Sequence, residues 1–173
     1  MQPDSVVTAA PAQPGLSMTA SLSERSLYVM RGDSAIAAFP VAIGEDNHPT
    51  PTGRFKIRKL VWNPRWVPPD EEWAKGETAK AAGDRDNPIK LVKMFFQEPD
   101  YYIHGTDKLK SLGKAASHGC LRMDPDEAAE VAKLLMEHGG EPRAENWFVR
   151  VLHFRRQEKI VYLKKPIPLT ITG

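Results

Sequence analysis

The residue of this chain best suited to chemistry is Cys120, its only cysteine, in the segment SHGCLR at 117–122. A free thiol has a pKa of ~8.5 and is mostly protonated at neutral pH, so a nucleophilic cysteine needs an imidazole or a similar cation beside it. His118 lies two residues before the thiol, and His104 lies sixteen residues upstream. The segment indicates either a thiol nucleophile with a histidine partner or, as for many free cysteines, a buried apolar side chain.

Two elements around the thiol would position it. The segment YYIH at 101–104 is a candidate strand, and the polar residues 107–116 are typical of a loop that returns Cys120 to His104. A single cysteine excludes an intramolecular disulfide framework and a cysteine-rich zinc site.

A helix is expected directly after the thiol, over 125–138. Asp124, Pro125 and Glu127 supply an N-cap, a first-position proline and a capping-box acid. Apolar residues then recur at helical spacing until Gly139 ends the pattern.

The rest of the chain predicts a mostly β fold with this one clear helix. Candidate strands are a hairpin of 27–30 with 35–43, a strand at 54–60 with period-two alternation, and two further strands at 147–154 and 159–163. Residues 61–88 lack periodicity and carry several prolines and three tryptophans, so they predict either a lid over a substrate groove or a surface loop anchored by its aromatic side chains.

The length of 173 residues suits one domain. We expect a flexible leader or linker at 1–17, a folded domain at 18–165 and a C-terminal tail at 166–173. The balance of 24 Lys and Arg against 22 Asp and Glu argues against a nucleic-acid binder. The longest apolar run, 35–44, is too short for a transmembrane helix, and the first residues do not resemble a secretory signal.

Several motifs together resemble the YkuD-type L,D-transpeptidases. In that family a histidine is followed some fifteen residues later by S-H-G-C-x-R, as IHGT at 103–106 is followed here by SHGCLRM at 117–123. VAIG at 41–44 with TPTGRF at 50–55 resembles the family's G…T-P-x-G-x-F element, and Asn87-Pro88 resembles its N-P segment. The resemblance covers roughly 21–163, with Ile89-Lys90 where the family often has a leucine-glycine pair.

The resemblance implies a β-sandwich or barrel catalytic domain and a role for each matching residue. Cys120 would be the nucleophile and His104 the general acid and base, with the Gly105 carbonyl orienting the imidazole. The N–H groups of Gly119 and Cys120 would hold the oxyanion. The side chains that would contact the peptide or shape its pocket are Ser117, His118 and Arg122.

The family's reaction is acyl transfer on peptidoglycan stem peptides. The thiolate attacks the carbonyl of a diamino acid's L-centre, terminal D-alanine leaves, and an amine then attacks the thioester. The product is a 3→3 cross-link or an anchored protein, with an outer-membrane lipoprotein as one acceptor, or a trimmed peptide when water attacks. By this resemblance we expect no metal or organic cofactor, a monomer, a periplasmic or cell-wall location and acylation by carbapenems.

Other functions remain open at this point. An L,D-carboxypeptidase or an NlpC/P60-like cysteine peptidase would trim the same peptides, the latter with a histidine after the cysteine such as His138 or His153. A sortase-like enzyme would need an upstream histidine such as His48, which sits among prolines that indicate a turn. A wall-binding module with an inert thiol would use the basic C-terminal region instead.

Overall fold

The computed structural model describes residues 12–173, and alternating burial along its strands shows how the sequence builds a sheet. β1 (Leu16–Ser21) places Leu16, Met18 and Ala20 in the core and its intervening residues outward. The other strands of the main sheet are β2 (Ser26–Arg31), β3 (Ser34–Pro40), β5 (Gly53–Trp62), β6 (Lys90–Gln97), β7 (Tyr101–Gly105), β9 (Leu121–Met123) and β10 (Lys159–Thr172).

In the described residues these eight strands are ordered β3-β2-β1-β10-β5-β6-β7-β9. β1 pairs parallel with β10 and β7 parallel with β9, while the other neighbouring pairs are antiparallel. The short strands β4 (Ile43–Gly44) and β8 (Ala115–Ser117) form a separate parallel pair. Short 3-10 turns lie at Glu72–Ala74 and Leu109–Ser111. The mostly β fold class with one main helix is confirmed.

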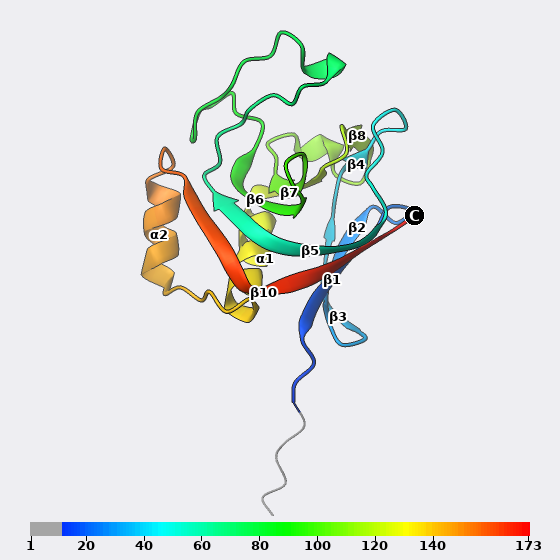
Figure 1. Cartoon of the computed structure of the whole chain (residues 1–173), viewed down its shortest axis with the longest axis vertical. Coiled ribbons are helices and arrows are strands. Elements are labelled where there is room, and N and C mark those ends of the chain that lie inside the picture. The colour runs from blue at the N-terminus through cyan, green and yellow to red at the C-terminus, as the bar shows by residue number, and fades with distance from the viewer. Residues whose placement is uncertain (1–11) are drawn as a thin grey trace, which may run out of the picture.

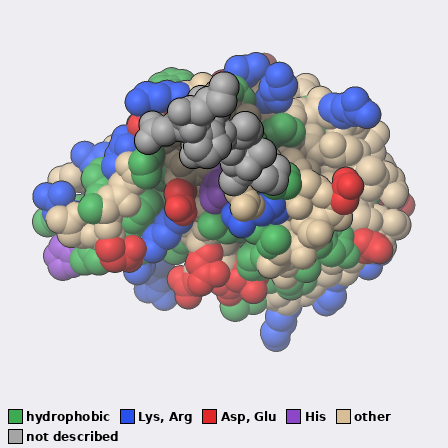
Figure 2. Space-filling view, turned by 90° about the horizontal axis from the view of Figure 1, so that it is seen from below, with side chains coloured by type: hydrophobic (Ala, Val, Ile, Leu, Met, Phe, Trp, Pro, Cys, Tyr) green, Lys and Arg blue, Asp and Glu red, His purple; other side chains and the backbone are tan. Residues whose placement is uncertain are grey.

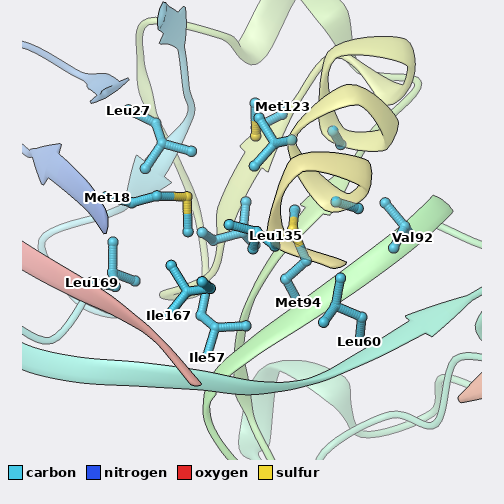
Figure 3. Close-up of a cluster of buried hydrophobic side chains, with 14 of the residues drawn as sticks. Met18, Leu27, Ile57, Leu60, Val92, Met94, Met123, Leu135, Ile167 and Leu169 are labelled. Carbon is cyan, nitrogen blue, oxygen red and sulfur yellow. The ribbon is translucent and has the colours of Figure 1, made fainter. Parts of the chain in front are cut away.

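The core lies between the curved sheet and the helix α1 (Pro125–His138). Figure 3 shows side chains from several strands and from Leu135 of the helix converging on one apolar cluster. Its labelled members from the strands include Met18, Leu60 and Met94, which are fully buried or nearly so. α1 packs on β6 and β7, so it fixes the two strands that precede the cysteine segment (Figure 1).

The expected helix over 125–138 is confirmed with the same bounds. The Asp124 carboxylate accepts hydrogen bonds from the N–H groups of Asp126 and Glu127, at 2.9 and 3.3 Å, so it caps the first turn as the sequence indicated. Glu127 does not complete a capping box: its Oε2 is buried without a hydrogen-bond partner among the described residues.

The expected strand at 147–154 is wrong, because Glu145–His153 forms a second helix, α2. The alternation of Val149 and Val151 suggested β structure. The structure instead buries Phe148 and Val151, which are three residues apart, and leaves Val149 exposed. Packing of that helical face against the core therefore outweighs the β propensity of the two valines.

Three further segments differ from the sequence expectations. β1 begins at Leu16, inside the stretch taken as a leader, whose residues 1–11 lie outside the described part. β6 was not foreseen. The stretch 166–173, expected as a tail, instead contributes Ile167–Thr172 to β10, where it pairs with β1 and β5.

The surface carries mixed charge. In Figure 2, which views the molecule from below relative to Figure 1, basic and acidic side chains are interspersed over the visible face. Within residues 12–173, no helix has the length and apolar character needed to cross a membrane.

Candidate active site

The face of the sheet turned away from α1 forms the floor of a cleft of about 910 Å³. Period-two alternation sends Val92 and Met94 of β6 into the core and Lys93 to the cleft. In the pairing of the strands Lys93 lies opposite His104, and His104 lies opposite Arg122. Because paired residues share a face of the sheet, these three side chains form a row across β6, β7 and β9.

The loop that carries the thiol is held in an unusual backbone conformation. Gly119 has a φ of 118°, and a Cβ at this position would lie 2.7 Å from a ring carbon of Tyr101. The buried Ser117 hydroxyl donates to the Cys120 carbonyl at 2.6 Å and accepts from the Gly119 N–H at 3.2 Å. These contacts require glycine at 119 and fix the direction of the Cys120 side chain.

Cys120 lies at the floor of the cleft and is half-buried. Its thiol donates a hydrogen bond to the carbonyl of Asp100 at 3.2 Å. Burial raises the pKa of the thiol to about 12, outweighing the opposite effects of a backbone hydrogen bond from Tyr102 and of the charge on Arg122. In the resting protein the Cys120 side chain is therefore a thiol rather than a thiolate.

His104 is buried in the same cleft, and its tautomer follows from its contacts. Nδ1 lies 2.8 Å from the carbonyl oxygen of Gly105, which can only accept, so Nδ1 carries the proton and Nε2 has a free lone pair. Burial lowers the pKa of His104 to about 4. The imidazole is thus neutral at physiological pH and able to accept a proton.

The backbone packing around His104 is tight. A Cβ on Gly105 would collide with the carbonyl of Lys90 and lie 2.9 Å from Cα of Pro125, the first residue of α1. The first residue of α1 and strand β6 therefore pack directly against Gly105, whose carbonyl orients the imidazole.

Arg122 presents a half-buried guanidinium to the cleft. In the described part of the chain its side chain makes no ion pair. Burial lowers the pKa of the guanidinium, and the nearby Cys120 and Glu45 act in the opposite direction. An arginine without a carboxylate partner in a cleft is suited to bind the carboxylate of a ligand.

His118 takes part in an aromatic stack at the edge of the cleft. Trp73 lies on the His118 ring with centroids 3.8 Å apart and an angle of 7° between the planes. The His48 ring contacts the His118 ring edge-on, with centroids 4.9 Å apart. Burial and the neighbouring His48 lower the pKa of His118.

The segment between β5 and β6 overhangs the cleft. In Figure 1 it is the green excursion at the top, above β6 and β7. Trp66 and Lys80 exchange two backbone hydrogen bonds, at 2.8 and 2.9 Å, which close the part that contains Trp73. The buried Asn87 side chain donates to the carbonyl of Pro64 at 2.8 Å and so joins the two ends of the excursion.

The structure brings together the residues that the sequence singled out around Cys120, since the side chains of His104, Ser117, His118 and Arg122 line one cleft with the thiol. It does not bring His138 and His153, the alternative histidine partners, to the cleft. His138 caps the end of α1 by bonding to the Leu134 carbonyl at 3.1 Å, and His153 ends α2 on the surface. Within residues 12–173, no group of three or more His, Cys, Asp or Glu side chains is placed to hold a metal ion.

The cleft residue Lys93 was missed from the sequence because β6 was not foreseen. Trp73 and His48 were noted for other reasons, and their contacts with His118 arise only through the fold. The proximity of His48 to the TPTG element at 50–53 is the one local signal for it, because Thr50 accepts a hydrogen bond from the Gly44 N–H at 2.9 Å and thereby closes the turn that carries His48.

Comparisons with known proteins agree with this fold. A family model described as YkuD, L,D-transpeptidase catalytic domain, matches residues 17–147. A curated relative from Bacillus licheniformis, named as an L,D-transpeptidase YkuD, is 28% identical over 115 residues, which are 66% of this chain and 57% of that protein. The chain thus spans little more than half of this relative's length.

Solved structures show the same fold. An L,D-transpeptidase from Mycobacterium smegmatis superposes with a TM-score of 0.57 at 17% identity, covering 91% of this chain and 58% of that one. L,D-transpeptidase 3 from Mycobacterium tuberculosis, in complex with a faropenem-derived adduct, gives a TM-score of 0.56 at 14% identity and covers 92% and 61%. Because the family model covers most of the chain, the chain belongs to the YkuD family of L,D-transpeptidase catalytic domains.

Proposed function

We propose that this protein is a cysteine L,D-transpeptidase that acts on peptidoglycan stem peptides through a thioester on Cys120. The observation that carries the proposal is the unprotonated Nε2 of a buried, neutral His104 in the same cleft as the thiol. Membership in the family supports the reaction class.

The first half of the reaction begins from the neutral pair. As the sulfur attacks the carbonyl of the diamino acid's L-centre, the thiol gives up its hydrogen bond to the Asp100 carbonyl. Its proton passes to His104 Nε2. The S–C bond forms, and the C–N bond to terminal D-alanine breaks as His104 returns the proton to the leaving amine. The Gly105 carbonyl stabilises the imidazolium that forms between these two transfers.

The tetrahedral intermediate needs hydrogen-bond donors for its oxyanion. The Gly119 N–H is engaged by Ser117 at 3.2 Å, a long bond that an oxyanion can compete with, and the Cys120 N–H lies beside the thiol. We assign both groups to the oxyanion, as the family resemblance implied. Each such donor typically contributes ~3 kcal/mol to the stability of the transition state.

In the second half an amine attacks the thioester. Its proton passes through His104 to the departing sulfur, so the C–N bond forms, the S–C bond breaks and the thiol is regenerated. A stem-peptide amine yields a 3→3 cross-link, a lipoprotein lysine yields an anchored protein, and water yields a trimmed peptide.

The substrate is held by charge as well as by shape. We assign the terminal carboxylate of the donor peptide to Arg122, which has no ion-pair partner within the described residues. His118 and Trp73 form a wall of the cleft. The Ser117 hydroxyl stabilises the thiol loop by its hydrogen bond to the Cys120 carbonyl, and contact of Ser117 with the peptide stays a prediction. The substrate places the active protein in the periplasm or at the cell wall, where we expect a monomer.

The test is incubation with purified tetrapeptide muropeptides, with products identified by mass. A cross-linked dimer with loss of D-alanine supports transfer, and free tripeptide indicates an L,D-carboxypeptidase. Unchanged muropeptides, under conditions where Cys120→Ala and the parent bind them equally, would identify a wall-binding module instead.

A further inference from the structure

The row of side chains that contains His104 carries a cation at each end. Lys93 on β6 and Arg122 on β9 both lie opposite His104 in the strand pairing. Neighbouring strands are ~4.8 Å apart, so the two backbone positions are separated by about 10 Å across the reaction centre. Arg122 is assigned to one carboxylate above, and Lys93 is left without a role.

Lys93 differs from the lysines around it. Lys59 forms an ion pair with Glu98 at 3.0 Å, and Lys90 forms one with Asp107 at 3.7 Å. Within residues 12–173, Lys93 makes neither an ion pair nor a side-chain hydrogen bond. Its ammonium instead lies over the rings of Phe95 and Tyr102, at 4.9 and 5.2 Å from their centroids.

The surroundings of Lys93 favour an anion. Burial in the cleft lowers the pKa of its ammonium, and the main opposing influence is the charge of Glu158. Aromatic faces stabilise a cation only partly, whereas a carboxylate would also supply the hydrogen-bond acceptors that the ammonium lacks. A half-buried lysine that faces a substrate cleft in this state is suited to bind an anionic group of the substrate.

We propose that Lys93 is a specificity residue that binds a second carboxylate of the donor peptide, the one on the side chain of its diamino acid. This inference rests on the proposed function. With the terminal carboxylate at Arg122 and the scissile carbonyl between Cys120 and His104, the side chain of the diamino acid extends toward β6. Glu158, whose charge acts on Lys93, is then available to the amino group on the carbon that carries the side-chain carboxylate of the diamino acid.

A matched pair of peptides tests the inference. L-Ala-γ-D-Glu-X-D-Ala is prepared with X as meso-diaminopimelate or as L-lysine, which differ only by the side-chain carboxylate. The parent is expected to favour the diaminopimelate peptide by about 10-fold or more in kcat/KM, in line with a charge-assisted hydrogen bond. Lys93→Met is expected to lose this preference because kcat/KM falls for the diaminopimelate peptide and stays unchanged for the lysine peptide. Lys93→Arg is expected to retain the preference.

Lys159→Met is the matched control, since it removes the same charge from an exposed position on β10 outside the cleft. It is expected to keep the parent's preference. No preference in the parent would overturn the inference, and so would a Lys93→Met variant that loses activity on both peptides by the same factor.

A binding measurement separates this inference from the proposed reaction. In the Cys120→Ala background, calorimetry is expected to show tighter binding of the diaminopimelate peptide than of the lysine peptide, and Lys93→Met is expected to abolish the difference. If the parent turns over neither peptide but this difference persists, the carboxylate site stands and the proposed reaction fails. If the Cys120→Ala protein binds both peptides equally or neither, the carboxylate site fails.

Discussion

Trp73 lies flat on His118, with ring centroids 3.8 Å apart, and so joins the excursion above the cleft to the loop that carries the Cys120 thiol. The Trp73 indole also donates to Glu71 at 2.7 Å, which orients the ring within its own segment. Since His118 is two residues from Cys120, this aromatic contact links the excursion to the thiol loop.

Trp73→Ala is expected to loosen this cover. An aromatic pair contributes about 1 kcal/mol beyond its buried area, so we expect a severalfold higher KM for the donor peptide and a smaller change in kcat. Hydrogen exchange should be faster in residues 67–79 of the variant. Peptide binding to Cys120→Ala should slow exchange in the same residues.

Phe154→Ala is the control for that variant, because Phe154 is an exposed aromatic residue at the end of α2. It should leave exchange in residues 67–79 unchanged. If peptide binding does not alter exchange there, residues 61–88 are an anchored surface loop rather than a lid.

The catalytic pair is tested by single replacements. Cys120→Ala should abolish turnover, and His104→Ala should lower kcat by about 10²–10⁴, the contribution of a positioned general acid and base. His153→Ala should match the parent because His153 lies on the surface end of α2. Loss of turnover in His153→Ala together with an active His104→Ala would instead favour an NlpC/P60-like arrangement.

The parts of the fold that could be predicted are those set by local signals. α1 was predicted with its true bounds because Asp124, Pro125 and Gly139 mark its ends. α2 was predicted as a strand because three of its five apolar residues are exposed or half-exposed, so its nine residues show no clear helical period in the sequence. β6 was missed because KLVKMFFQ mixes buried and cleft-facing apolar residues, including Phe95 and Phe96 on opposite faces.

In the candidate site, too, only the residues marked by local motifs could be predicted from the sequence. Cys120, His104 and Arg122 could be found because two short motifs carry them. Lys93 joins their row only through the pairing of β6 with β7, and Trp73 reaches His118 from 45 residues away in the chain. Contacts of this kind depend on tertiary structure and leave no periodic or local pattern in the sequence.

Gly119→Ala tests whether the thiol loop depends on its left-handed backbone. The added Cβ meets the Tyr101 ring at 2.7 Å, and the φ of 118° is unfavourable for alanine. We expect a loss of about 2–4 kcal/mol. It should be seen as a lower free energy of unfolding where the loop keeps its conformation, and as an at least 30-fold lower kcat/KM where the loop shifts. Gly76→Ala is the comparison, since Gly76 has a φ of 87° but open space around it. Equal effects of the two substitutions would show that crowding by Tyr101 is unimportant.

Stability should fall in mild acid because of His104. Its pKa is about 4 in the folded protein and ~6.5 when unfolded, so between these values the unfolded chain binds more protons. The free energy of unfolding therefore decreases as pH falls from 7 toward 4, by about 2 kcal/mol at pH 5 from this group. Urea unfolding at pH 7 and at pH 5 measures this decrease in the free energy of unfolding. His104→Gln should lose this part of the pH dependence, whereas His153→Gln should keep it.

Acylation by a β-lactam tests the nucleophile without a stem peptide. The Cys120 sulfur, with His104 to take its proton, can open a strained β-lactam amide, and the carboxylate of a carbapenem offers Arg122 the same partner as a peptide terminus.

Intact mass after carbapenem treatment should show one adduct on the parent and none on Cys120→Ala. Arg122→Met should slow adduct formation by about 10-fold, because a charge-assisted hydrogen bond to the carboxylate is lost. Labelling by a small neutral thiol reagent should slow less, because it loses only the effect of the Arg122 charge on the pKa of the thiol. That comparison separates binding of the carboxylate from reactivity of the sulfur. A parent that the neutral reagent labels at Cys120 but that forms no carbapenem adduct would argue against a transpeptidase site, since the thiol would then be reactive without the surroundings that acyl transfer requires.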